Sequence, residues 1–342
     1  MKKFDFVVGN PPYQEDVDSN NETYSPPIYH DFLNNAFNIS HKVSMITPAR
    51  FLFNAGATPK SWNKKMLNDP HFKVLYYEQN SNKIFSNTDI KGGVTITYRD
   101  DSKNFGKIEV FSPYKTLMDI NNKVSTNETN SITNIIFTQN RFNLSALYND
   151  YPEFENVIGS NGKDKRFRNN IFQKINIFYD ENQKYDCIRV IGVINNKRVW
   201  RYIDKKYVDT VHDNLSKWKV IVPRANGKGL LGETLSTPIV VPPNTGYTQT
   251  FIGIGSFDNE KTANNLLKYV KTKFLRALLS ILKIDQHNER NVWSKIPLQD
   301  FTENSDIDWS KSIAEIDQQL YKKYGLSPEE IDFIEEKVQE ME

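Results

Sequence analysis

The sequence predicts an α/β layer at the N-terminus, followed by an α+β domain and a C-terminal helical tail. Three observations predict this order. Short apolar runs alternate with a helical stretch over residues 1–100, short turn-rich strands fill 185–255, and two capped helical segments end the chain. With 342 residues the chain is long enough for about two domains.

The N-terminal layer begins with an apolar run, Phe4 to Val8, which predicts a buried strand. Gly9 and a double proline end it, because proline cannot donate to a strand ladder. Residues 28–39 place their apolar side chains at helical spacing. Further strands are expected at residues 43–46, 73–77 and 93–98.

Residues 112–135 turn polar and poor in core formers, which indicates a linker or long loop. We therefore expect four regions: a catalytic part at 1–112, a linker at 113–150, a second domain at 151–300 and a helical hairpin at 301–342.

The second half of the chain carries clear local signals. Asn195-Asn196 between two apolar runs predicts a hairpin. Residues 260–283 predict one long helix. In the tail, Ser310 is expected to cap the first helix, and Ser327 with Glu330 forms a capping box for the second.

Composition excludes several classes of protein. A mean hydropathy of −0.61 and the lack of a long uncharged apolar run argue against a membrane span. The single cysteine, Cys187, excludes an internal disulfide and favours the reducing cytoplasm. The five histidines do not show the spacing of a metal site, so no metal is expected. They are His30, His41, His71, His212 and His287.

Charge is unevenly distributed along the chain. Residues 159–206 hold 12 Lys/Arg against 5 Asp/Glu, whereas residues 300–342 hold 4 Lys/Arg against 13 Asp/Glu. A basic middle beside an acidic tail indicates that the middle meets a polyanion.

The motif that carries chemistry is Asn10-Pro11-Pro12-Tyr13, directly after the first strand. An asparagine oxygen and a backbone carbonyl can accept both N–H bonds of an exocyclic or amide nitrogen and favour a pyramidal, more nucleophilic nitrogen. The prolines fix the direction of the carbonyl, and the tyrosine ring offers a stacking surface to a planar substrate. This chemistry suits methyl transfer to nitrogen, and a base in duplex DNA must first leave the stack.

FDFVVGNPPYQ is similar to motif IV of N6-adenine DNA methyltransferases, and the chain resembles the γ-class enzymes of type II restriction–modification systems. The match continues through IYHDFLNNAF, VSMITPARFL and KIFSNTDIKGGVTITYRD, and the C-terminal part looks like the target-recognition domain of that family. The resemblance implies the second half of a Rossmann-like methyltransferase sheet and an S-adenosylmethionine cofactor. It also implies Asn10, Pro11, Pro12 and Tyr13 as the residues that bind the base, with Tyr98 as a weaker candidate for the base pocket.

One family feature is missing from the sequence. The glycine-rich loop that holds the cofactor precedes motif IV in the family, and here only GIGS at 253–256 is similar, which a tight strand bend explains better. The first strand is then expected to be an exposed apolar edge. We therefore expect a second subunit, or an N-terminal segment outside this chain, to supply most of the cofactor site, and an endonuclease partner is possible.

Basic residues interleaved with aromatic ones suit double-stranded DNA. The candidate DNA-binding residues are Lys163, Lys165, Arg166, Arg168, Lys197, Arg198, Arg201, Arg224, Asn226 and Lys228. Of these, Arg224 and Asn226 lie in a glycine-rich loop and are candidates for reading base edges.

Two other functions stay open. The chain could be a DNA-binding specificity module or an inactive remnant, which the missing glycine-rich loop favours. It could also methylate a protein glutamine or RNA, because the same motif serves amide nitrogens.

Overall fold

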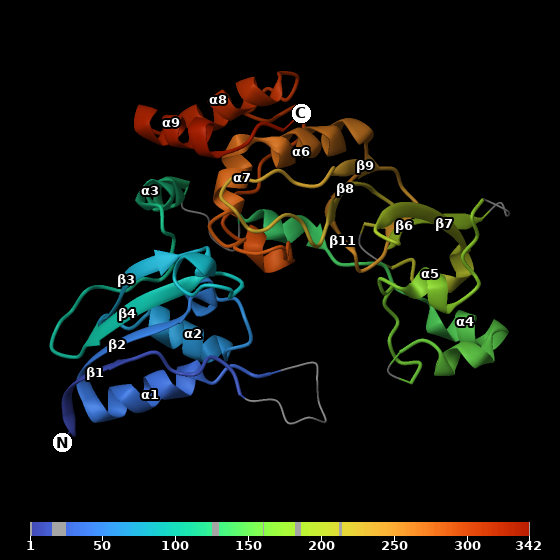
Figure 1. The fold of residues 1–342 in the computed structure, drawn as a ribbon. Helices are drawn as coiled ribbons and strands as arrows, with labels where there is room; N and C mark the ends of the chain where they lie inside the picture. Colours follow the sequence, from blue (N-terminus) through green and yellow to red (C-terminus); the bar gives the residue numbers. More distant parts are fainter. Residues whose placement is uncertain are drawn as a thin grey trace. The chain divides into compact units, whose positions relative to one another are not determined.

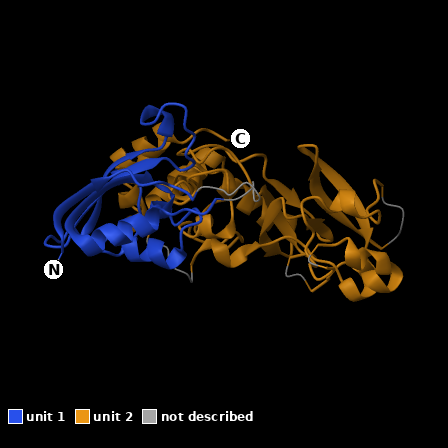
Figure 2. Ribbon diagram, turned by 60° about the horizontal axis from the view of Figure 1, so that its bottom comes forward, with its two compact units in different colours: residues 1–115 blue, residues 116–342 orange. Residues whose placement is uncertain are grey.

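The computed structural model describes residues 2–15, 25–124, 130–159, 161–181, 186–211 and 214–341. Its contacts divide the chain into two compact units, residues 1–115 and residues 116–342 (Figure 2). His212 lies outside the described residues. The two units are described separately below.

Unit 1 is a four-stranded sheet with helices, which agrees with the expected α/β class. Its strands are β1 (Phe4–Gly9), β2 (Ser40–Pro48), β3 (Phe72–Glu78) and β4 (Val94–Asp100), in the order β1-β2-β4-β3. β1 and β2 are parallel, whereas β4 runs antiparallel to both of its neighbours. The helices α1 (Tyr29–Ile39) and α2 (Lys60–Leu67) lie on the same side of the sheet (Figure 1).

The core of unit 1 lies between the sheet and α1. Tyr29, Leu33 and Ala36 form the buried stripe of α1, and they recur at the three- and four-residue spacing of one helix face. Val43, Met45 and Thr47 are buried side chains of β2, on the face that alternates with Ser44 and Ile46.

β1 is a strand at the edge of the sheet, in agreement with the expected exposed apolar edge. It is not the buried strand that its apolar run alone predicts: Phe4 is 54%, Phe6 46% and Val8 73% exposed. These side chains share one face of the strand, since residues two apart point the same way. The first strand is therefore an apolar edge with unpaired backbone groups, of the kind that a further strand can join.

Unit 2 contains two sheets, β10-β6-β7 and β5-β11-β8-β9. Its strands are β5 (Ile136–Phe137), β6 (Cys187–Ile194), β7 (Lys197–Asp204), β8 (Trp218–Pro223), β9 (Ile239–Val241), β10 (Thr245–Tyr247) and β11 (Phe251–Phe257). Its helices are α3 (Lys115–Val124), α4 (Leu144–Asp150), α5 (Ile171–Lys174), α6 (Glu260–Lys271), α7 (Lys273–Leu279), α8 (Ile313–Lys323) and α9 (Pro328–Lys337).

Several local predictions for unit 2 are confirmed. Asn195 and Asn196 form the turn between β6 and β7, and both adopt the positive φ that a two-residue hairpin turn needs. The capping box of Ser327 and Glu330 is present at the start of α9. None of the helices in the described ranges is both long and apolar enough to span a bilayer.

Three predictions for this half of the chain are wrong. Residues expected to be a linker hold α3 and α4. The first tail helix is capped by Ser312, which forms its own capping box with Glu315, and not by Ser310. The expected long helix at 260–283 is broken into α6 and α7 at Thr272, whose extended backbone ends one helix while its hydroxyl accepts the Leu275 N–H and caps the next.

Candidate functional site

The Asn10–Tyr13 turn follows β1 at its carboxyl end. Gly9 is the last paired residue, opposite Met45 of β2, and Pro11 and Pro12 cannot extend the ladder because they lack an N–H. Pro11 is buried, whereas Asn10 and Pro12 are exposed. Among the described residues, the Asn10 side chain makes no hydrogen bond, so its amide is available to a ligand.

The chain that follows the turn is held by the segment leading into α1. Ile28 donates its backbone N–H to the carbonyl of Tyr13 at 3.2 Å, and Glu15 donates to the carbonyl of Pro26 at 3.0 Å. The Ser25 hydroxyl also donates to the carbonyl of Glu15. These bonds fix the position of Tyr13 beside the end of β1.

Tyr13 is half-buried, with its hydroxyl more deeply buried than its ring. The hydroxyl oxygen has no hydrogen-bond partner among the described residues. Burial raises the pKa of Tyr13 to about 12, because desolvation disfavours the phenolate. At neutral pH the side chain is therefore an uncharged ring with an unsatisfied hydroxyl.

Phe85 is the aromatic side chain that the fold places against Tyr13. The two ring centroids are 6.4 Å apart with an interplanar angle of 68°. Phe85 is held in its loop by Ser81, whose carbonyl accepts the Phe85 N–H at 2.8 Å, and by the Thr88 hydroxyl, which donates to the Phe85 carbonyl at 2.7 Å. Phe85 was not among the site residues predicted from the sequence, although it lies in the KIFSNTD stretch that carries part of the resemblance.

Tyr98, the residue expected in the base pocket, lies elsewhere on the sheet. Its ring is stacked on Phe6, with centroids 6.2 Å apart, and its hydroxyl donates to Asp100 at 3.0 Å. Tyr98 pairs with Ser44 of β2. Ser44 lies one residue before Met45, which is the residue opposite Gly9 at the end of β1. The structure brings Phe85, and not Tyr98, to Tyr13.

The comparison with family models bears on this same region. Residues 1–85 match the model of the Eco57I restriction-modification methylase family. The matched segment holds β1, the Asn10–Tyr13 turn and Phe85. It is therefore similar to a restriction–modification methylase, which supports a DNA methyltransferase. A search of curated proteins found no match to the chain.

The glycine-rich stretch of unit 2 and the metal-ligating side chains bear on a cofactor or metal site. The GIGS segment lies in β11, where a Cβ on Gly253 would come within 2.4 Å of the Tyr247 hydroxyl and where the pairing with β8 shifts at a bulge. As expected, it is a strand irregularity, and its residues do not fit a nucleoside. Across the described ranges, no group of three or more His, Cys, Asp or Glu side chains could hold a metal ion.

Arg166 and Arg168, two of the expected DNA-binding residues, bind a carboxylate of their own loop. Both form ion pairs with Asp164, whose side chain is 5% exposed. The Arg166 guanidinium, together with backbone and Arg168 hydrogen bonds, holds the pKa of Asp164 well below its usual range. Asp164 therefore neutralises one positive charge of this loop, and both arginines are engaged with it.

Two more expected arginines are also engaged. Arg198 donates to the carbonyls of Ser236 and Thr237, both at 2.7 Å, and Arg201 pairs with Asp180 at 2.8 Å. The exposed lysines of these clusters, by contrast, have no ion-pair partner in the part of the chain that the structure describes. They are Lys163, Lys165, Lys197 and Lys228.

The loop after β8 holds the two residues expected to read base edges. Arg224 is 30% exposed and pairs with Glu289 at 2.9 Å. Asn226 is buried, and its amide is used inside the protein: it donates to the carbonyl of Thr234 at 2.8 Å and accepts the N–H of Ser236 at 2.5 Å. Asn226 therefore shapes the loop, and its amide is not free to meet a base edge in this structure.

Proposed function

We propose that this protein is an adenine-specific DNA methyltransferase of a restriction–modification system, which transfers a methyl group from S-adenosylmethionine to N6 of an extruded adenine. The observation that carries the proposal is the Asn10 amide. It is exposed and without a described partner, directly after a strand in the segment that matches the methylase model. The cytoplasm, where DNA and the cofactor meet, is the expected location.

Asn10 and the backbone of the turn would act on the adenine amino group. The Asn10 side-chain oxygen accepts one N6–H and a carbonyl of the turn accepts the other, which favours a tetrahedral nitrogen with a free lone pair. S-adenosylmethionine supplies an electrophilic methyl group when bound. Held in this way, the nitrogen lone pair would face the methyl group that the cofactor supplies, and the methylated nitrogen would then lose a proton to water. No general base is required, because the cationic product is acidic.

Tyr13 and Phe85 would hold the extruded base. Stacked bases in DNA are about 3.4 Å apart, so a base between two parallel rings needs a gap of about twice that distance. The ring centroids are already 6.4 Å apart. Rotation of one ring until the two are parallel would complete the sandwich, and the stacking would partly offset the cost of unpairing the base.

The uncovered side of unit 1 supports a partner polypeptide. β1 is an open edge with exposed Phe4, Phe6 and Val8. An edge strand with a large apolar surface favours pairing with another segment. We propose that this segment extends the sheet beyond β1 and carries most of the cofactor site, since the described residues offer no glycine-rich loop that fits it.

Transfer of labelled methyl groups from S-adenosylmethionine to unmethylated DNA tests the proposal. The assay compares the chain alone, the chain with the product of the adjacent gene, and the same mixture with Asn10→Ala. We expect label in DNA with the partner and loss of at least a hundredfold with Asn10→Ala. DNA binding without transfer would favour a specificity module, and label in protein or RNA would favour the other alternative.

A further inference from the structure

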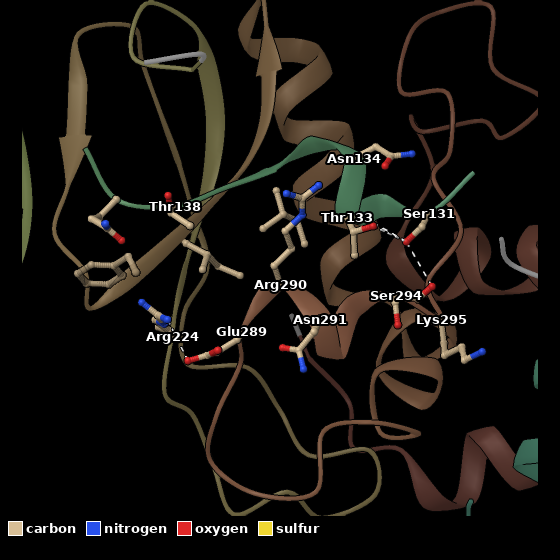
Figure 3. Close-up of a pocket in the computed structure, with 14 residues that line it drawn as sticks. Ser131, Thr133, Asn134, Thr138, Arg224, Glu289, Arg290, Asn291, Ser294 and Lys295 are labelled. Atoms are coloured by element: carbon tan, nitrogen blue, oxygen red, sulfur yellow. Dashed lines mark hydrogen bonds and ion pairs between the residues drawn. The ribbon is translucent and has the colours of Figure 1, made fainter. Parts of the chain in front are cut away.

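An open cleft of about 900 Å³ lies within unit 2, and Arg224 is the one lining residue that it shares with the candidate DNA-binding residues named from the sequence. Its floor includes Ile136 of β5 and Phe251 and Ile252 of β11, which are neighbouring strands of one sheet. Figure 3 shows the side chains around it, with the Arg224–Glu289 pair on one side and Ser131 and Thr133 on the other. The cleft is therefore assembled from segments that are far apart in the sequence.

The lining of this cleft is polar and carries more positive than negative charge. Its cations are Arg224, Arg290 and Lys295, and Glu289 is its carboxylate. The uncharged polar residues are Ser131, Thr133, Asn134, Thr138, Gln139, Asn291 and Ser294. Arginine, lysine, hydroxyl and amide groups are the side chains that contact phosphate and sugar in DNA complexes, whereas pockets for small molecules are mostly apolar and aromatic.

Arg290 distinguishes this cleft from the loops described above. It is exposed, and among the described residues its guanidinium has no ion-pair or hydrogen-bond partner. In Figure 3 it lies between Arg224 and Thr133. It also borders an adjoining hollow lined by Arg141, Ile136 and Thr138, which continues the cleft along the same segment. A cation without a partner can bind a phosphate without first breaking an internal ion pair.

The walls of the cleft are held in place by the fold. On the Arg224 side, Asn288 donates its N–H to the Arg224 carbonyl at 2.8 Å, which ties the loop after β8 to the loop that carries Glu289. On the other side, the Ser131 hydroxyl donates to the Ser294 carbonyl at 3.3 Å, and Ile132 donates its N–H to the Ile296 carbonyl at 2.9 Å. Polar groups fixed in this way need little reordering when they bind.

We propose that this cleft binds the sugar–phosphate backbone of duplex DNA, an assignment that rests on the DNA methyltransferase function proposed above. Arg290 contacts a phosphate directly. Glu289 opposes binding in the free protein, because it pairs with Arg224 and adds negative charge to the cleft.

The test measures binding of the full chain to an unspecific DNA duplex by fluorescence anisotropy over a series of salt concentrations. Arg290→Gln is expected to weaken binding and to lower the slope of log K against log salt by about 0.9, the value for one phosphate contact. The matched control is Lys322→Gln, which removes one exposed cation of α8 and is expected to leave the slope unchanged.

The expected effect of Glu289→Gln is tighter binding of DNA, which misfolding of the variant would not produce. Removing the carboxylate is expected to tighten binding roughly two- to fivefold and to steepen the slope, because Arg224 is then released to the phosphate. If the wild type binds DNA but neither variant differs from the Lys322 control, the cleft assignment is overturned and the proposed function stands. If the wild type binds no DNA, both are overturned. Tighter binding of duplex RNA, with the same variant pattern, overturns the assignment to DNA.

Discussion

Tyr13 gives the most specific prediction, because its ring and its hydroxyl lie in different environments. Tyr13→Phe keeps the ring that faces Phe85 and removes a buried hydroxyl that has no described partner. Burying an unsatisfied hydroxyl costs about 1–3 kcal/mol. We therefore expect Tyr13→Phe to raise the free energy of unfolding of unit 1 by about 1 kcal/mol and to change the rate of methyl transfer by less than about threefold.

Tyr13→Ala removes the stacking surface as well. Stacking on an aromatic side chain contributes about 1–3 kcal/mol per base, which corresponds to a loss of roughly fivefold to 150-fold in kcat/KM. The assay is methyl transfer at limiting DNA concentration, together with chemical denaturation of each variant. If Tyr13→Phe loses as much activity as Tyr13→Ala, methyl transfer depends on the hydroxyl and not on the ring, and the stacking role is refuted.

Three further predictions concern the fold and its surfaces. Thr272→Ala removes the buried cap of α7 and should lower the free energy of unfolding of unit 2 by about 1 kcal/mol in urea denaturation; an unchanged value would contradict the capping role. Asp164 has a depressed pKa in the folded state, so its ionised carboxylate stabilises the folded protein at pH values above the pKa that it has in the unfolded chain. This stabilisation is lost as the pH falls below about 4. Asp164→Asn should therefore flatten the acid limb of the stability profile and free Arg166 and Arg168, and an acid limb like that of the wild type would argue against the ion pairs. Val8→Lys should reduce aggregation of the chain alone and also weaken partner-dependent methyl transfer; normal activity with the partner would rule out pairing at β1.

Much of the local structure could be predicted from the sequence, because local patterns determine it. The apolar stripe of α1, the Asn195-Asn196 turn and the Ser327 capping box depend on residues within a few positions of one another. The Asn10–Tyr13 motif was found in the same way, as a short motif after a strand. Its availability to a ligand is a tertiary property that only the structure describes.

The errors arise where a distant residue decides the outcome. The break at Thr272 is reinforced by Asp317 of α8, which accepts the N–H groups of Lys273 and Phe274 at 2.9 and 2.8 Å. The helical periodicity of residues 260–283 cannot indicate the contact with Asp317, which lies outside that range. Phe85 reaches Tyr13 through the fold of a loop after β3, and spacing along the chain cannot show such a contact.

The local charge pattern does not show which cations are available to a phosphate. Counting cations identified a basic stretch, but a count does not reveal which cations are already paired. Arg166 and Arg168 bind Asp164, whereas Arg290, which belongs to no basic cluster in the sequence, has no described partner and lies in a cleft. The geometry of the partners, and not the local net charge, decides which side chains can meet phosphate.

The identity of the methylated atom tests the central claim most directly. DNA from cells that express the chain with its neighbouring gene product is digested to nucleosides and analysed by mass spectrometry, with Asn10→Ala expressed in parallel. Our account predicts N6-methyldeoxyadenosine with the wild type and none above background with Asn10→Ala. A methyl group on cytosine, or equal N6-methyladenine from both proteins, would contradict it.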